Sequence, residues 1–275
     1  MKRMLIGMTA VASLLATSAS AADLPMRPYT KAPVFAEPVF NWTGFYLGGN
    51  IGYSWGRSSD TSTLTNSAGT PLFASTDKAA LNGVFGGGQI GYNWQIQNFV
   101  WGLEADIQGT KEMGSRSFVC PAGVCIPTIA GVPAPIGSMP VPAILGQKID
   151  WLGTVRGRAG VAVTPTVLLY ATGGLAYGEV NTSESIGVIP SAFSSNTTNA
   201  GWTAGGGIEG AIGGNWTARV EYLYVDLGKV NGSFITPLTA VGGGVIATSY
   251  SSHITDNIVR VGINYKFNGP VVARY

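Results

Sequence analysis

The chain has 275 residues, of which 40 are glycine and 10% are aromatic, whereas charged residues make up only 11% and the formal net charge is +2. Soluble domains usually carry about 25% charged residues, so this composition argues against an ordinary soluble or secreted enzyme. The small net charge gives no basic surface for nucleic acid, and two cysteines are too few for a disulfide scaffold.

The first 21 residues have the parts of a secretory signal peptide. Lys2 and Arg3 form its positive region, residues 4–15 are apolar, and small residues precede a cleavage point between Ala21 and Ala22. An uncleaved anchor is the alternative, but the apolar run is shorter than the roughly 20 residues that a membrane-spanning helix needs. Without Lys2 and Arg3, the exported chain has 14 basic and 14 acidic residues.

Residues 22–41 form the next segment, which contains four prolines and little hydrophobic periodicity. This composition predicts an extended, Pro-rich periplasmic linker. A cell-wall tether is the alternative interpretation.

Eight runs of alternating apolar and polar residues follow from Trp42 onward. In the last run, Val259, Val261 and Ile263 alternate with Arg260 and Asn264. A transmembrane β-barrel requires this period of two, with apolar residues facing lipid and polar residues facing the lumen. Alternation is weakest in the fifth run. The runs are residues 44–55, 83–95, 99–108, 148–163, 167–180, 201–212, 216–224 and 258–267.

The connections between these runs alternate in length. Long connections span residues 57–82, 111–147, 181–200 and 229–253, and short ones lie at 96–98, 164–166 and 213–215. Outer-membrane barrels have short periplasmic turns and longer outer loops. The sequence therefore predicts an all-β, eight-stranded antiparallel up-and-down transmembrane barrel over residues 42–267, with both ends in the periplasm.

Several segments resemble one known family. They are WTGFYLGGNIGY at 42–53, GLEAD at 102–106, GWTAGGGIE at 201–209, RVEYLY at 219–224 and RVGINYKF at 260–267. Together these segments resemble the small outer-membrane β-barrel family of alphaproteobacteria, whose architecture is similar to the OmpA barrel. The resemblance implies an outer-membrane location and a role in envelope integrity and surface properties, without catalytic residues. The tail at 268–275 departs from barrels that end on the last phenylalanine, so Phe267 or Tyr275 could be the aromatic that the assembly machinery reads.

Nine charged side chains fall on the predicted lumen face. An eight-stranded barrel is just wide enough for side chains to fill it, and unpaired buried charges are costly. These charges therefore predict a salt-bridged plug, with a narrow ion path or a catalytic carboxylate pair as alternatives. They are Glu104, Asp106, Arg156, Arg158, Glu209, Arg219, Glu221, Arg260 and Lys266.

Two glycine-rich stretches, at 86–91 and 205–210, match the G-x-G-x-x-G pattern. A dinucleotide site needs a strand before this pattern and a helix after it. Both stretches lie inside predicted strands, so we expect no nucleotide and no other cofactor. The glycines instead leave space in the lumen or ease strand bending.

The remaining candidates for chemistry are few. Cys120 and Cys125 lie in the second long connection of an exported chain, where a small-loop disulfide is favoured over metal binding. The single histidine, His253, is expected to be an exposed loop residue. A hydrolase would have to combine His253 with a group such as Asp256, but no motif in the sequence identifies a nucleophile. We expect neither a metal site nor enzymatic activity.

The leading functional interpretation is a structural outer-membrane barrel. A small passive pore is one alternative, and a barrel whose Ser- and Asn-rich loops act as an adhesin or ligand receptor is another. The expected partners are outer-membrane lipid and the barrel-assembly machinery, with no nucleic acid, an unidentified surface ligand at most, and a monomeric state.

Overall fold

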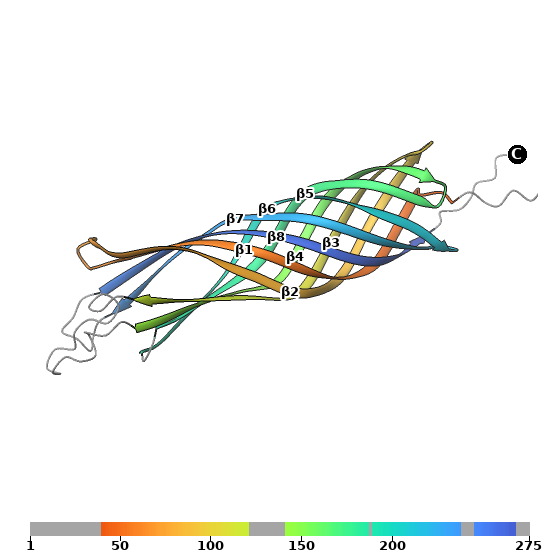
Figure 1. The fold of residues 1–275 in the computed structure, drawn as a ribbon. Helices are drawn as coiled ribbons and strands as arrows, with labels where there is room; N and C mark the ends of the chain where they lie inside the picture. Colours follow the sequence, from red (N-terminus) through yellow and green to blue (C-terminus); the bar gives the residue numbers. More distant parts are fainter. Residues whose placement is uncertain (1–39, 121–140, 187–188, 238–244, 268–275) are drawn as a thin grey trace, which may run out of the picture. The chain divides into compact units, whose positions relative to one another are not determined.

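A computed structural model describes residues 40–120, 141–186, 189–237 and 245–267. These residues form a closed barrel in which each strand pairs with its sequence neighbours and β1 pairs with β8 (Figure 1). All pairs are antiparallel, which confirms the predicted fold class. The strands are β1 (Gly44–Thr65), β2 (Pro71–Ile96), β3 (Phe99–Cys120), β4 (Val141–Thr164), β5 (Val167–Ile186), β6 (Ile189–Gly213), β7 (Trp216–Pro237) and β8 (Val245–Phe267).

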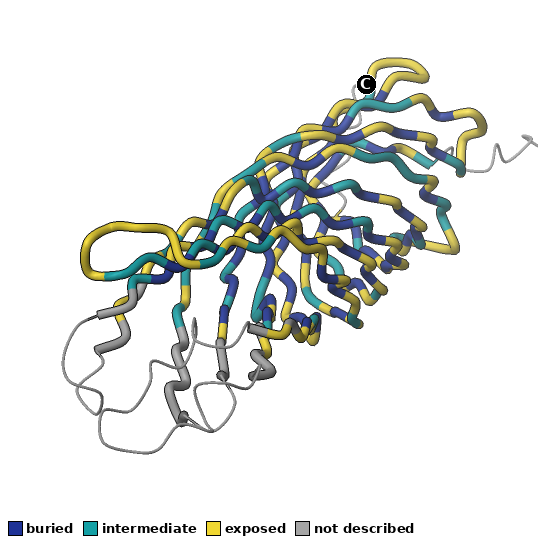
Figure 2. The backbone as a smooth tube through the Cα atoms, turned by 60° about the vertical axis from the view of Figure 1, so that its left-hand side comes forward, coloured by how far each residue is buried: buried dark blue, intermediate teal, exposed yellow. Residues whose placement is uncertain are grey.

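Burial alternates along each strand, because successive side chains point to opposite faces of the sheet (Figure 2). Large apolar side chains lie on the outside, with Ile51 63% and Leu103 59% exposed. Polar side chains lie inside, where Gln89 is 2% exposed. This distribution is the reverse of that in a soluble barrel and suits a surface that contacts lipid. No helix among the described residues is long and apolar enough to cross a membrane.

Three tight turns close one end of the barrel, at residues 97–98, 165–166 and 214–215. Gln97 and Gly214 have positive φ angles of 56° and 55°, which tight hairpins favour. The first and last barrel residues, Phe45 and Phe267, pair at the same end. By the length rule for outer-membrane barrels, we expect this to be the periplasmic end.

At the outer end the strands are much longer than predicted. The expected loop at 57–82 is strand except for a turn at 66–70, where Asn66 accepts hydrogen bonds from Gly69 and Ala68. Parts of the other three expected loops also extend β3 to β8, and their centres lie outside the described residues. The prediction of long loops was wrong there because Ser- and Thr-rich strands pair through their backbones without an apolar alternation to reveal them.

Candidate functional site

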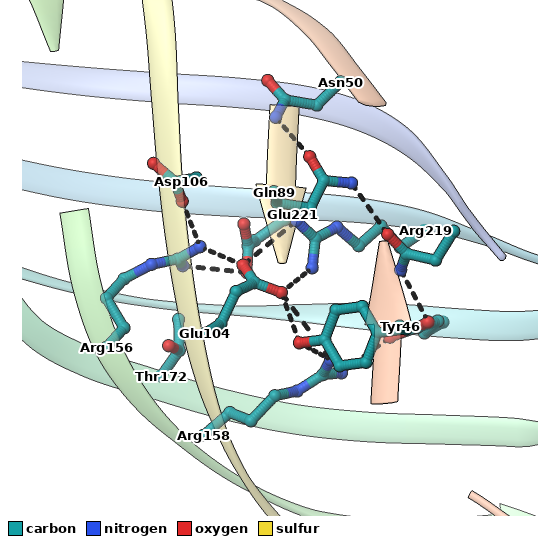
Figure 3. A network of polar contacts seen from close by, with 12 residues as sticks. Tyr46, Asn50, Gln89, Glu104, Asp106, Arg156, Arg158, Thr172, Arg219 and Glu221 are labelled. Carbon is teal, nitrogen blue, oxygen red and sulfur yellow. Dashed lines mark hydrogen bonds and ion pairs between the residues drawn. The ribbon is translucent and has the colours of Figure 1, made fainter. Parts of the chain in front are cut away.

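The lumen holds the main cluster of functional side chains, and Glu104 on β3 lies at its centre (Figure 3). Its carboxylate accepts hydrogen bonds from Arg156 and Arg219, and from Arg260 at 3.4 Å. The Tyr46 hydroxyl donates to the same carboxylate at 2.6 Å. One carboxylate therefore joins side chains from β1, β4, β7 and β8.

Asp106 and Glu221 extend this cluster across the lumen. Arg156 donates to Asp106 at 2.8 Å and to Glu221 at 3.0 Å. Arg260 donates to Glu221 at 2.6 Å and to Asp106 at 3.1 Å. The two arginines therefore bridge the same two carboxylates from opposite sides, and all four side chains are buried.

Glu209 forms the periplasmic part of the cluster. It accepts hydrogen bonds from Arg158 at 2.7 Å, from Thr217 at 2.6 Å and from Asn264 at 2.9 Å. The Arg158 guanidinium also lies 3.9 Å from the centre of the Tyr170 ring, within cation–π range. Arg158 thus links Glu209 to the rest of the cluster through its contact with Glu104, at 3.9 Å.

Eight of the nine predicted lumen charges are therefore brought together, and their four carboxylates match four guanidiniums. We call these eight residues the charge network. Lys266 lies apart from it, because its ammonium donates to the carbonyl of Asn41 and lies 4.9 Å from the Phe40 ring centre. The charge network is the salt-bridged arrangement that burial of so many charges requires.

Glycines make room for the two tyrosines that contact the charge network. A Cβ added at Gly91 would lie 2.4 Å from the Tyr46 ring, and one at Gly207 would lie 2.7 Å from the Tyr170 hydroxyl. Both glycines belong to the stretches that match the nucleotide-binding pattern, and both lie within strands rather than before a helix. They leave space in the lumen, as the sequence suggested.

Apolar side chains pack in the lumen on the outer side of the charge network, beside buried polar residues such as Ser54, Glu112 and Asp256. Most of them lie on β4, β5, β7 and β8, and the hydrophobic pattern did not predict them as a layer. We call this set the apolar layer: Leu81, Phe85, Ile149, Leu152, Ala176, Val180, Leu223, Val225, Leu227, Val230, Tyr250, Ile254 and Ile258.

Two causes hid part of this layer from a pattern with a period of two, whereas Leu223 and Ile258 lie on the lumen face that the alternation predicts. A register shift between Ile149 and Trp151, and another between Asp226 and Gly228, change which positions face the lumen. In addition, β5 carries apolar residues on both faces, which explains its weak alternation. The periplasmic side is filled as well, by a cluster of Trp42, Val100, Ala162, Leu168 and Tyr170.

Three carboxyl groups were also missed as lumen residues, and one of them, Asp60 on the inner face of β1, pairs with Arg116 of β3 at 3.6 Å. Asp256 lies between Ile254 and Ile258 on the inner face of β8, and Glu112 lies on the inner face of β3, where the sequence predicted a loop. Asp256 and Glu112 interact with each other, and among the described residues neither carboxyl contacts an arginine or a lysine.

The other residues that the sequence singled out lie apart from the charge network or outside the described residues. His253 lies in β8 rather than in a loop, so that prediction was wrong, and its Nε2 lies 3.0 Å from Oδ1 of Asp226. His253 and Asp256 lie on opposite faces of β8, so the two side chains do not form a pair. Cys120 ends β3, whereas Cys125, Ala21 and Ala22 lie outside the described residues, as do the leader and tail. Among described residues, no group of three His, Cys, Asp or Glu is placed to hold a metal.

Comparisons with known proteins agree with the fold. The family model described as "Outer membrane protein beta-barrel domain" matches residues 9–267. The chain is 39% identical to the 31 kDa outer-membrane immunogenic protein of Brucella melitensis biotype 1 over 94% of this chain and 98% of that protein. It is 30% identical to the 22 kDa outer membrane protein of Rhizobium leguminosarum bv. viciae, over 86% of this chain and 82% of that one. Among solved structures, the outer membrane protein OprG of Pseudomonas aeruginosa matches 85% of this chain and 100% of its own, with 12% identity and a TM-score of 0.48.

Proposed function

This chain belongs to the outer membrane protein β-barrel family, and we propose that it acts there as a structural, non-conducting barrel that supports envelope integrity. The observation that carries this proposal is the filling of the lumen. The charge network crosses the lumen, and the apolar layer lies on its outer side. The apolar layer occupies mainly the side of the lumen formed by β4, β5, β7 and β8, so an ion that passed the charge network would meet apolar side chains there.

The bonding of the charge network supports a structural rather than a catalytic role. Each of its carboxylates already accepts hydrogen bonds from at least one arginine. A general acid or base instead needs a position from which it can exchange a proton with a substrate. The relatives in Brucella and Rhizobium carry names that describe outer-membrane proteins and no reaction.

The outer ends of the strands support a contribution to surface properties. They continue well past the apolar belt and carry Ser, Thr and Asn on their outer face. The Brucella relative is named as immunogenic. We infer that the corresponding part of this chain is displayed at the cell surface.

The envelope role can be tested in cells that lack this chain. We expect the deletion strain to leak a periplasmic enzyme and to grow less well in bile-salt detergent. Wild-type chain should restore both properties, and so should a variant with shortened outer ends, because the proposal assigns integrity to the barrel. Full resistance in the deletion strain would contradict this function.

A further inference from the structure

One side of the barrel carries an excess of positive charge just beyond the membrane belt. Arg57 on β1, Lys78 on β2 and Lys229 on β7 are exposed on the outer face, and none has an ion-pair partner within the described residues. Strand pairing places them together, because Ser59 is opposite both Lys78 and His253, and His253 is opposite Lys229. Arg57 lies two residues before Ser59 on the same face.

We call Arg57, Lys78 and Lys229 the cation wall. The aromatic residues beside it give its depth relative to the membrane. Trp55 is the outward residue immediately before Arg57 on β1, and its carbonyl accepts a hydrogen bond from Asn257 at 3.2 Å. Asn257 in turn accepts one from the Tyr222 hydroxyl at 2.7 Å. Trp and Tyr mark the interface between lipid and water. Arg57 therefore lies one outward residue beyond the interface, and Lys78 and Lys229, in register with Ser59, lie two outward residues beyond it, at the level of lipid headgroups.

A polar groove lies directly beyond the cation wall, on β1, β7 and β8. It has a volume of about 470 Å³ and is lined by hydroxyl and amide side chains of β1, β7 and β8. Thr61, Ser251 and Asn231 form one row across it, and Thr63, Ser249 and Ser233 form the next. Hydroxyl and amide groups can donate and accept hydrogen bonds, as sugar hydroxyls do.

Elsewhere among the described strands, the exposed cations near this depth are single or paired, and Lys111 on β3 is the single one. On β4, Lys148 forms an ion pair with Asp150. On β5, Glu179 accepts a hydrogen bond from Trp151 at 2.8 Å. The exposed or half-exposed carboxylates of these strands have other partners: Asp226 contacts His253 and the backbone amide of Gly228, and Asp77 pairs with Arg116. The three exposed cations are thus grouped on β7, β1 and β2, which lie side by side with β8 in the barrel (Figure 1).

We propose that this wall binds an anionic glycolipid of the outer leaflet, with its phosphate groups on Arg57, Lys78 and Lys229 and its saccharide in the groove of Thr61 and Ser251. Charge complementarity and depth favour a lipid, because basic residues at a membrane surface attract anionic headgroups. The order of apolar belt, cations and hydroxyls follows the order of acyl chain, phosphate and sugar. This inference requires the membrane location but not the closed lumen.

The test uses the full chain refolded in detergent micelles and titrated with bisphosphorylated lipid A that carries core sugars. Native mass spectrometry measures the bound lipid. The test variant combines Arg57→Ala, Lys78→Ala and Lys229→Ala, and the matched control combines Lys111→Ala and Lys148→Ala on other strands. All five side chains are exposed, and the heat-dependent gel mobility of folded barrels verifies that each variant folds.

We expect the test variant to bind at least about tenfold more weakly than the wild type, and the control to bind like the wild type. Dephosphorylated lipid A should bind weakly to all three. Thr61→Val with Ser251→Val should reduce binding only of the lipid that carries sugars. Equal binding by the test and control variants, or no binding by the wild type, would overturn the proposal. Equally tight binding of soluble polyphosphate without lipid would also overturn it, in favour of a soluble polyanion.

Discussion

Arg156 on β4 donates a hydrogen bond of 3.0 Å to Glu221 on β7, although these strands are not neighbours in the barrel. The contact therefore crosses the lumen. A barrel of eight strands has room for side chains but not for an open channel around such a contact. The closed lumen follows from charged residues that bond to each other across it.

The first prediction concerns this contact. Arg156→Ala removes the partner of Glu104, Asp106 and Glu221, so the free energy of unfolding should fall by about 3–5 kcal/mol. Unfolding by urea in lipid vesicles would measure it. Arg156→Met combined with Glu221→Met should cost less than the sum of the single changes, because no lone charge remains. Strictly additive losses would contradict the assigned pair, and Lys148→Ala is the exposed control.

The second prediction concerns the lipid-facing surface. Val261 is 50% exposed on the outside of β8, within the apolar belt. Val261→Arg should therefore lower the free energy of unfolding by about 2–4 kcal/mol in vesicles. Ser251→Arg lies on the same face of the same strand, beyond the belt, and should change it little. Similar losses at the two positions would show that the belt is placed wrongly.

The third prediction concerns Asp256. It lies between Ile254 and Ile258 of the apolar layer, where it interacts with the buried Glu112 and, among the described residues, with no arginine or lysine. Asp256→Asn places an amide donor beside the neighbouring Glu112 carboxyl, so the free energy of unfolding should rise by about 1 kcal/mol. Glu104→Gln is the same carboxyl-to-amide change inside the charge network and should lower the free energy of unfolding, because four arginines would lose a partner charge. A loss of stability in both variants would contradict the difference that we assign to the two sites.

The fourth prediction concerns orientation. In a background without Cys120 and Cys125, a cysteine at Thr61 should react with a membrane-impermeant reagent on intact cells. A cysteine at Asn98, in a tight turn of the other end, should react only after the outer membrane is opened. The reverse labelling pattern would mean that the outer and periplasmic ends are exchanged.

The fold could be predicted from the sequence because the lipid-facing side chains are apolar and recur at every second residue. Val259, Val261 and Ile263 alternate with polar residues, and membrane insertion imposes this period on nearly every strand. The same alternation placed Arg260 and Glu221 inside. It could not show which charges bond, because a face assignment gives neither the depth of a residue nor its neighbours across the lumen.

Part of the apolar layer and the outer strand extensions could not be predicted from this alternation, for two different reasons. Ile149 and Val230 face the lumen because register shifts change the alternation locally. Ser62 and Thr63 lie in a strand because their backbones pair with β8. Neither effect depends on residue polarity, so a hydrophobic pattern cannot detect it.

Conductance of the purified, folded chain in planar bilayers tests the closed lumen most directly. The charge network and the apolar layer predict no steady channels in the wild type, even at high voltage. Ile258→Gly combined with Leu223→Gly would remove side chains from the apolar layer while leaving the charge network in place. This variant should also conduct little, because the charge network still crosses the lumen. Steady, sizeable channels in the wild type would contradict the structural role and favour a passive pore.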